Sequence, residues 1–205
     1  MEPTREVVGR ALPLDRSDVD TDQIIPAEWL KRVERTGFGA GLFSSWREDP
    51  DFVLNDPRFD GAEILVAGPN FGTGSSREHA VWAIEDYGFR AVISPRFGDI
   101  FRTNCAKVGV VPAQVPEEAA RALLHTVEAD PSTEIIVDVE ARRVRCHAAG
   151  VDVEFDMDDF TRERFLQGLD DVGLTLRHAD AIDAYEQHRA TDQTWLPTTT
   201  TTATP

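Results

Sequence analysis

The sequence predicts an α/β fold with a parallel β/α centre and a β-rich lobe. Between residues 64 and 128, short apolar runs alternate three times with segments of helical periodicity. This alternation is typical of parallel β/α packing. From residue 134 to residue 155 the pattern changes to three short runs of alternating apolar and polar residues, which indicate an antiparallel meander. A chain of 205 residues is long enough for one sizeable core.

The first sixty residues predict few regular elements. We expect a strand within residues 6–14, a polar turn over 15–22, and one helical turn over 27–31. Residues 31–50 then carry three glycines among aromatic residues. A loop of this length within a compact domain is usually functional.

The alternating region supplies the centre of the predicted fold. Strands are expected at 64–67, 91–94 and 110–112, and helices at 76–87, 97–108 and 117–128. Gly88 and Gly109 follow the first two helices, as glycine often does at a helix C-terminus.

The last third of the chain completes the predicted domain. The meander strands are expected at 134–139, 144–147 and 151–155, followed by helices at 160–166 and 178–189. We therefore expect residues 1–189 to form a single domain. Residues 190–205 are rich in threonine and show no core pattern, so we expect a disordered tail.

Composition excludes several classes of partner. The net charge of −16 argues against nucleic acid and anionic membrane surfaces. No apolar run approaches the length of a membrane span, and the N-terminus lacks an apolar signal core, so a cytoplasmic protein is expected. Cys105 and Cys146 suit a reducing compartment, and two isolated thiols cannot ligate an iron–sulfur cluster by themselves.

The most informative stretch runs from Gly68 to Ala80 and reads Gly-Pro-Asn-Phe-Gly-Thr-Gly-Ser-Ser-Arg-Glu-His-Ala. It predicts a glycine-rich turn between the strand at 64–67 and a helix. Ser75 and Ser76 are N-cap candidates, and Glu78 has the spacing from Ser75 that a capping box requires. The free N–H groups of the helix and the planar guanidinium of Arg77 then predict an anion site.

Three phosphate or acyl-transfer motifs are excluded at this turn. A P-loop needs Gly-Lys-Ser/Thr, a dinucleotide fingerprint needs a third glycine, and a nucleophile elbow needs Gly-x-Ser-x-Gly. The sequence around Gly74 matches none of them. Two hydroxyls, an arginine and a helix N-terminus suit instead a carboxylate whose charge grows during a reaction.

The segment Asn-Phe-Gly-Thr-Gly-Ser-Ser-Arg-Glu-His-Ala resembles the signature of the swivelling domain of the aconitase superfamily. Together with Asp-Val-Asp-Thr-Asp-Gln-Ile-Ile-Pro at 18–26 and Arg-Thr-Gly-Phe-Gly at 35–39, it resembles the small subunits of bacterial 3-isopropylmalate dehydratase. The resemblance covers about residues 13–185 and implies an aconitase-type swivelling β/β/α domain.

This resemblance also implies a function. Such a subunit belongs to a hydro-lyase that interconverts 2-isopropylmalate and 3-isopropylmalate through 2-isopropylmaleate in leucine biosynthesis. The resemblance implies a heterodimer with a large subunit, a small dicarboxylate substrate bound between them, and no cofactor on this chain. The four-iron–four-sulfur cluster would lie on the large subunit and act on the leaving hydroxyl.

The same resemblance assigns roles to residues. Ser75 corresponds to the catalytic base, and the N–H groups of Ser76 and Arg77 with the Arg77 side chain would stabilise the aci-carboxylate. Asp22 corresponds to an aspartate that orients an arginine, and Gly74 allows the main chain to approach the substrate. The resemblance also implies a further substrate-binding arginine. This sequence is one residue shorter than the family pattern just before the segment that would contain it.

The sequence leaves that arginine open, and either Arg32 or Arg35 would fill the role. If Ser75 and Ser76 have only a structural role, they would be simple N-caps of the helix. His79 is four residues after Ser75, but we interpret it as a side chain that braces the turn through a hydrogen bond to the main chain or a carboxylate. Phe38, Leu42 and Phe43 would offer an apolar wall to an isopropyl group.

Two alternative functions remain at this point. The fold could serve a related hydro-lyase whose substrate is citraconate, dimethylmalate or homoaconitate. It could also be a non-catalytic anion-binding or regulatory module, although the intact Ser75-Ser76-Arg77 run argues against that interpretation.

Overall fold

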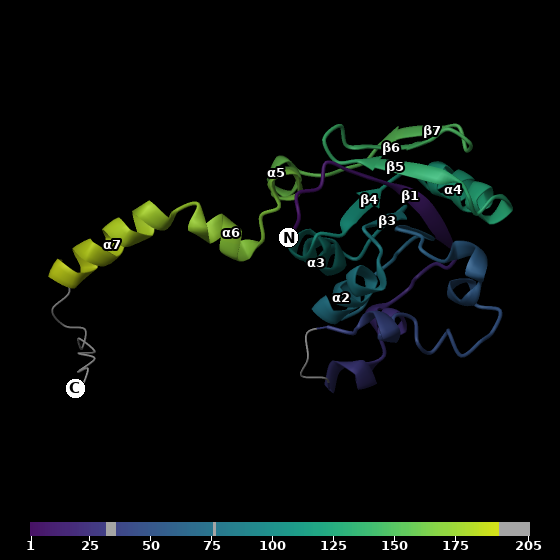
Figure 1. The fold of residues 1–205 in the computed structure, drawn as a ribbon, viewed down its shortest axis with the longest axis horizontal. Helices are drawn as coiled ribbons and strands as arrows, with labels where there is room; N and C mark the ends of the chain where they lie inside the picture. The colour runs from purple at the N-terminus through teal and green to yellow at the C-terminus, as the bar shows by residue number, and fades with distance from the viewer. Residues whose placement is uncertain (32–35, 76, 193–205) are drawn as a thin grey trace. The chain divides into compact units, whose positions relative to one another are not determined.

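The computed structural model describes residues 1–31, 36–75 and 77–192. Its main element is a seven-stranded mixed sheet in the order β4-β3-β2-β1-β5-β6-β7 (Figure 1). The strands are β1 (Glu6–Leu14), β2 (Ile64–Ala67), β3 (Ala91–Ser94), β4 (Val111–Gln114), β5 (Glu134–Asp138), β6 (Arg143–Cys146) and β7 (Val151–Glu154). The fold class is the predicted one, with a parallel β/α centre and an antiparallel lobe.

Strand β1 joins the two halves of the sheet. Its C-terminal half, Ala11–Leu14, pairs in parallel with β2, and β2, β3 and β4 continue in parallel. Its N-terminal half, Glu6–Arg10, pairs antiparallel with β5, which begins the meander. The central place of β1 in the sheet was not predicted, because the local sequence of a strand does not determine which strands pair with it.

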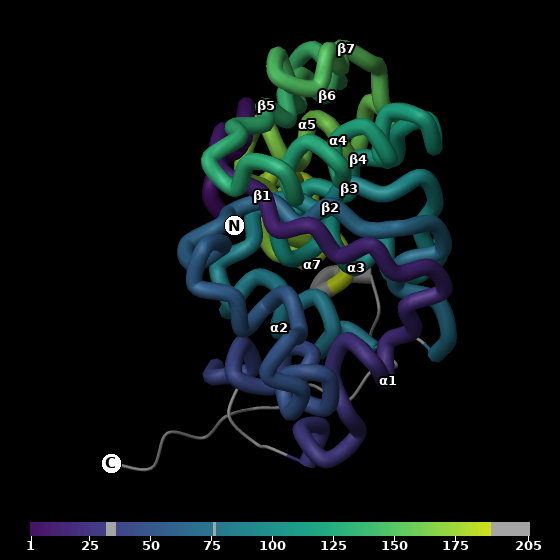
Figure 2. Tube along the Cα trace, turned by 90° about the vertical axis from the view of Figure 1, so that its right-hand side faces the viewer, coloured from purple at the N-terminus to yellow at the C-terminus, as the bar shows by residue number. Residues whose placement is uncertain are grey.

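Three helices cover the sheet. They are α2 (Glu78–Tyr87), α3 (Asp99–Val108) and α4 (Glu117–Ala129). Helix α4 buries Leu123, Leu124 and Val127 and packs against β1, β2, β3 and β7, so the sheet curls around it. Helices α2 and α3 pack against each other on the other face (Figures 1 and 2).

The connection between β1 and β2 contains short helical segments instead of a plain loop. They are α1 (Thr21–Ile24), η1 (Ala27–Lys31), η2 (Gly39–Gly41), η3 (Val53–Asn55) and η4 (Pro57–Phe59). The sequence predicted only the turn over 27–31, because single turns of helix lack a measurable period.

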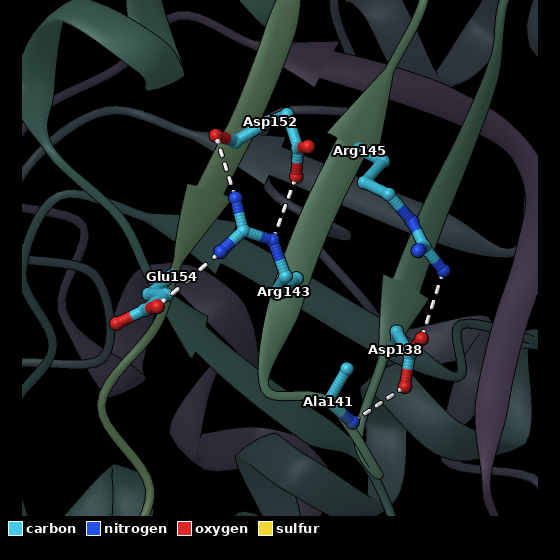
Figure 3. Close-up of polar contacts among 6 residues, drawn as sticks. All are labelled: Asp138, Ala141, Arg143, Arg145, Asp152 and Glu154. Atoms are coloured by element: carbon cyan, nitrogen blue, oxygen red, sulfur yellow. Dashed lines mark hydrogen bonds and ion pairs between the residues drawn. The ribbon is translucent and has the colours of Figure 1, made fainter.

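Ion pairs cross the exposed face of the antiparallel lobe (Figure 3). Nε of Arg143 donates to Asp152 at 2.8 Å, and Nη1 of the same residue contacts Glu154 at 3.3 Å. Arg145 pairs with Asp138 at 2.8 Å. Such cross-strand pairs stabilise the sheet, and the acidic side chains on the edge strand β7 discourage pairing with another chain.

The chain divides into two compact units, Met1–Asp170 and Asp171–Pro205. The first ends with α5 (Asp159–Gln167), and the second contains α6 (Asp171–Leu176), which was not predicted, and α7 (Ala179–Asp192). The expected disordered tail falls largely on residues 193–205, outside the described ones. Over residues 1–31, 36–75 and 77–192, none of the helices has both the length and the apolar sequence that a membrane crossing requires.

Two glycines with similar φ angles offer a matched stability test. Gly72 has φ 73° and Gly150 has φ 63°, so alanine at either is strained. A methyl at Gly72 would also lie 2.6 Å from Cβ of the buried Phe101, whereas nothing lies within 4 Å at Gly150. We expect Gly150→Ala to cost about 1–2 kcal/mol and Gly72→Ala about 2–5 kcal/mol, measured by denaturant unfolding. Equal losses would contradict the close packing of the turn on α3.

Candidate functional site

The glycine-rich turn lies where the carboxyl ends of two parallel strands meet. Strands β1 and β2 pair in parallel, so the segment after β1 reaches the turn after β2. Gly72 N–H donates to the carbonyl of Val19 at 2.8 Å, and Thr21 N–H donates to the carbonyl of Thr73 at 3.0 Å. Carboxyl-end loops of parallel strands are where α/β proteins bind ligands.

The loop after β3 holds the turn from the other side. Phe71 N–H donates to the carbonyl of Arg96 at 3.0 Å, and Gly98 N–H donates back to the carbonyl of Phe71 at 2.9 Å. The Phe71 ring is buried edge-on against Phe101, with ring centroids 5.3 Å apart. The base of the turn is therefore fixed from both sides.

Helix α1 brings two side chains to the turn. The Thr21 hydroxyl donates to the carbonyl of Ser75 at 2.9 Å, and the Asp22 carboxylate forms an ion pair with Arg77. Sequence reasoning did not select Thr21, although its place beside Asp22 was the available signal. The pairing of Asp22 with an arginine agrees with the orienting role expected for it, which stays a prediction.

The structure brings together four of the predicted site residues. Gly74 and Ser75 are exposed, Gly74 has φ 91°, and the Arg77 side chain is 19% exposed against 56% for Asp22. Ser76, Arg32 and Arg35 lie outside the described residues. The site is thus an exposed turn with a braced arginine beside it.

The prediction of a capping box at the start of α2 is wrong. The helix begins at Glu78, and its N-cap is Arg77, whose side chain makes no capping hydrogen bond. Glu78 turns instead toward Lys107 of α3, with Nζ and Oε1 3.6 Å apart. A helix start that is not capped by its N-cap side chain leaves main-chain N–H groups that can bind an anion.

Comparisons with known proteins identify the family of this chain. A family model of the aconitase C-terminal domain matches residues 1–118, and a model of the C-terminal domain of 3-isopropylmalate dehydratase small subunits matches residues 171–199. The chain is 65% identical to the 3-isopropylmalate dehydratase small subunit of Parafrankia sp. over 93% of this chain and 95% of the relative. It is 63% identical to that of Acidothermus cellulolyticus over 97% and 98%.

The chain belongs to the 3-isopropylmalate dehydratase small-subunit family. A solved structure supports the same fold: 3-isopropylmalate dehydratase from Methanocaldococcus jannaschii matches with a TM-score of 0.64 and 26% identity. The match covers 88% of this chain and 99% of that one. The predicted relationship to these small subunits and to the aconitase superfamily is confirmed.

Within the described part of this small subunit, His79 contacts aromatic rings and not the hydrogen-bond partners expected for it. Its ring lies 5.2 Å from the ring of Phe38 and 4.6 Å from that of Trp82, measured between centroids. Among the described residues, no hydrogen bond joins its side chain to the main chain, a carboxylate or Ser75. His79 braces the start of α2 by packing, so the interpretation as a hydrogen-bonded brace is wrong.

The prediction that the 38–43 loop offers an apolar wall to the substrate is also wrong. Phe38, Leu42 and Phe43 are at most 1% exposed. Phe43 stacks on Trp46 with ring centroids 5.3 Å apart. These side chains belong to the core of the small subunit, and a buried side chain presents no surface to a substrate.

The described residues do not fit an iron–sulfur cluster. In that part of the chain no three His, Cys, Asp or Glu side chains gather as metal ligands would. Cys105 and Cys146 are both buried, and burial raises the pKa of the Cys105 thiol well above its usual value. A cluster needs several cysteine thiolates, commonly four, brought together.

The two thiols should therefore be inert in the folded subunit. At pH 8 a disulfide reagent such as DTNB should label fewer than about a tenth of them, because both side chains are buried and the raised pKa of Cys105 also suppresses its thiolate form. Denaturant should release both. Rapid labelling of Cys105 in the native protein, followed by absorbance, would contradict its core position.

Proposed function

We propose that this chain is the small subunit of a two-subunit 3-isopropylmalate dehydratase. In this proposal it interconverts 2-isopropylmalate and 3-isopropylmalate through 2-isopropylmaleate, in leucine biosynthesis, only when assembled with its large subunit. The observation that carries the proposal is an exposed turn with Ser75 and Arg77, where Asp22 of α1 forms an ion pair with Arg77. Family membership supports the reaction class.

Ser75 is the proposed base. It takes the proton from the carbon next to a substrate carboxylate, and the electron pair left behind forms the double bond as hydroxide departs from the adjacent carbon. A serine hydroxyl is a weak base unless its alkoxide is stabilised. The partial positive charge at the start of α2 and the nearby Arg77 guanidinium would supply that stabilisation.

Arg77 is the proposed carboxylate clamp. A guanidinium carries five N–H donors in one plane, and Asp22 engages Nη1. The remaining donors can bind a second carboxylate in the two-pronged geometry that arginine favours. The ion pair with Asp22 also fixes the guanidinium before substrate arrives, so less side-chain entropy is lost on binding.

We assign the departure of hydroxide to the large subunit. Hydroxide is a poor leaving group without a metal or a strong acid, and the described residues of this chain offer no metal ligand set. The exposure of Gly74 and Ser75 suits a site that is completed by a second subunit. In the proposal the four-iron–four-sulfur cluster lies on the large subunit, the two subunits form a heterodimer, and the enzyme works in the cytoplasm.

Reconstitution tests this function. The purified chain should fold, bind no iron and show no dehydratase activity. Addition of a cluster-loaded large subunit under anaerobic conditions should give turnover of isopropylmalate, followed by the absorbance of isopropylmaleate. Activity of the isolated chain would contradict the two-subunit proposal, and faster hydration of citraconate would move the assignment to a related hydro-lyase.

Ser75→Ala extends the same experiment. The variant should still assemble with the large subunit, because one exposed serine contributes little contact area, but its kcat should fall by at least about a thousandfold. Full activity in the assembled variant would place the base elsewhere.

Arg77→Lys should cost far more activity than stability. Lysine keeps the charge but cannot make the planar two-pronged contact. We expect kcat/KM to fall on the order of a hundredfold or more, the scale for loss of a fixed charge contact, with a small change in the unfolding midpoint. Arg121→Lys, in an exposed pair with Glu117 on α4, is the matched control. Near-normal kcat/KM in Arg77→Lys would exclude the clamp.

A further inference from the structure

Thr21 makes two hydrogen bonds to the turn that carries the proposed base. Its main-chain N–H donates to the carbonyl of Thr73 at 3.0 Å, and its hydroxyl donates to the carbonyl of Ser75 at 2.9 Å. Thr21 is only 2% exposed. A side chain this buried supports the turn from below and does not itself meet the substrate.

The Ser75 carbonyl needs such a support. The preceding residue, Gly74, has φ 91°, a region that glycine enters freely and leaves freely. The amide that begins at the Ser75 carbonyl is planar, so a hydrogen bond to its oxygen fixes the orientation of the whole plane. Without that bond, rotation at Gly74 would reorient Ser75 and its hydroxyl together.

Thr21 stands on a rigid base of its own. Asp20 and Gln23 form a reciprocal capping box at the start of α1, with hydrogen bonds of 2.8 and 2.9 Å. The carbonyl of Ile24 accepts a hydrogen bond from Phe43 N–H at 2.8 Å, and Ile24 and Ile25 are fully buried. The short helix α1 is therefore anchored at both ends. A group that is hydrogen-bonded to Thr21 is held in place relative to the core.

We propose that Thr21 is a positioning residue for Ser75. Its hydroxyl holds the Ser75 carbonyl so that the serine side chain stays aimed at the carbon from which the proton is removed. The inference rests on the proposed function for the role of Ser75, whereas the support of the turn itself rests only on the contacts of Thr21.

Two substitutions separate positioning from packing. Thr21→Val keeps the volume and removes the hydroxyl, and Thr21→Ser keeps the hydroxyl and removes a methyl group. In the assembled enzyme we expect Thr21→Val to lower kcat about tenfold to a hundredfold, with KM changed less than about twofold. Thr21→Ser should retain kcat within about threefold, although it loses some thermal stability through the missing methyl group. A purely structural role predicts the opposite order, with Thr21→Ser the more damaged enzyme.

The proton-transfer step gives a second readout. With substrate deuterated at the carbon that loses its proton, Thr21→Val should show a larger isotope effect on kcat/KM than the wild-type enzyme, because a misaimed base makes proton removal more rate-limiting. The matched control is Thr126→Val, which removes a half-buried threonine hydroxyl that donates to the carbonyl of Ala122 at 2.8 Å in α4. It should leave kcat and the isotope effect unchanged.

Amide hydrogen exchange makes the inference independent of activity. In the isolated chain, peptides covering residues 72–78 should exchange faster in Thr21→Val than in wild type, Thr21→Ser or Thr126→Val. If the wild-type enzyme fails to turn over isopropylmalate, the proposed function is overturned, and the exchange result alone decides whether Thr21 holds the turn. Unchanged exchange, or equal kcat in Thr21→Val and wild type, would overturn the positioning role.

Discussion

The parallel pairing of β1 with β2 is the interaction on which the site depends. Pairing of Ala11–Leu14 with Ile64–Ala67 places the carboxyl ends of both strands at one edge of the sheet. The two segments that follow then meet, and Val19, Asp20 and Thr21 form main-chain contacts with Gly72 and Thr73. Loss of this register would separate Asp22 from Arg77, because neither residue lies in the sheet and each depends on the loop that follows its strand.

The turn combines a fixed base with an open outer face. Hydrogen bonds from the loops after β1 and β3 hold Phe71 to Ser75, while Gly74 and Ser75 stay exposed. Catalytic stabilisation of developing charge depends on donors that are oriented before the reaction begins. A rigid turn on one subunit provides such donors, and its open face leaves room for the second subunit to supply the rest of the site.

Packing of the 38–43 loop also helps to orient the site, although the loop lies outside the turn. Phe38 lies against His79 and Trp82 of α2, and the carboxylate of Asp86 on the same helix accepts a hydrogen bond from Gly39 N–H at 2.8 Å. The loop therefore fixes α2 against the body of the domain. Helix α2 begins at the turn, so this packing helps set the direction of the N–H groups at its start.

The sequence by itself determined the family and most of the strands and helices from residue 64 onward, and the tertiary structure decided the contacts. Residues 64–67 and 91–94 were predicted as strands and are strands, because short continuous apolar runs between turn residues have few other solutions. The local run Asn70–Ala80 was distinctive enough to indicate the superfamily.

The start of α2 at Glu78, the packing of His79 and the burial of Phe38 were not predictable, since each is set by neighbours from other elements. Asp22 and Arg77 are 55 residues apart, and only the parallel sheet decides that they meet. Thr21 is the clearest case, because its place beside Asp22 could mark the position but not the contact of its hydroxyl with a carbonyl 54 residues away.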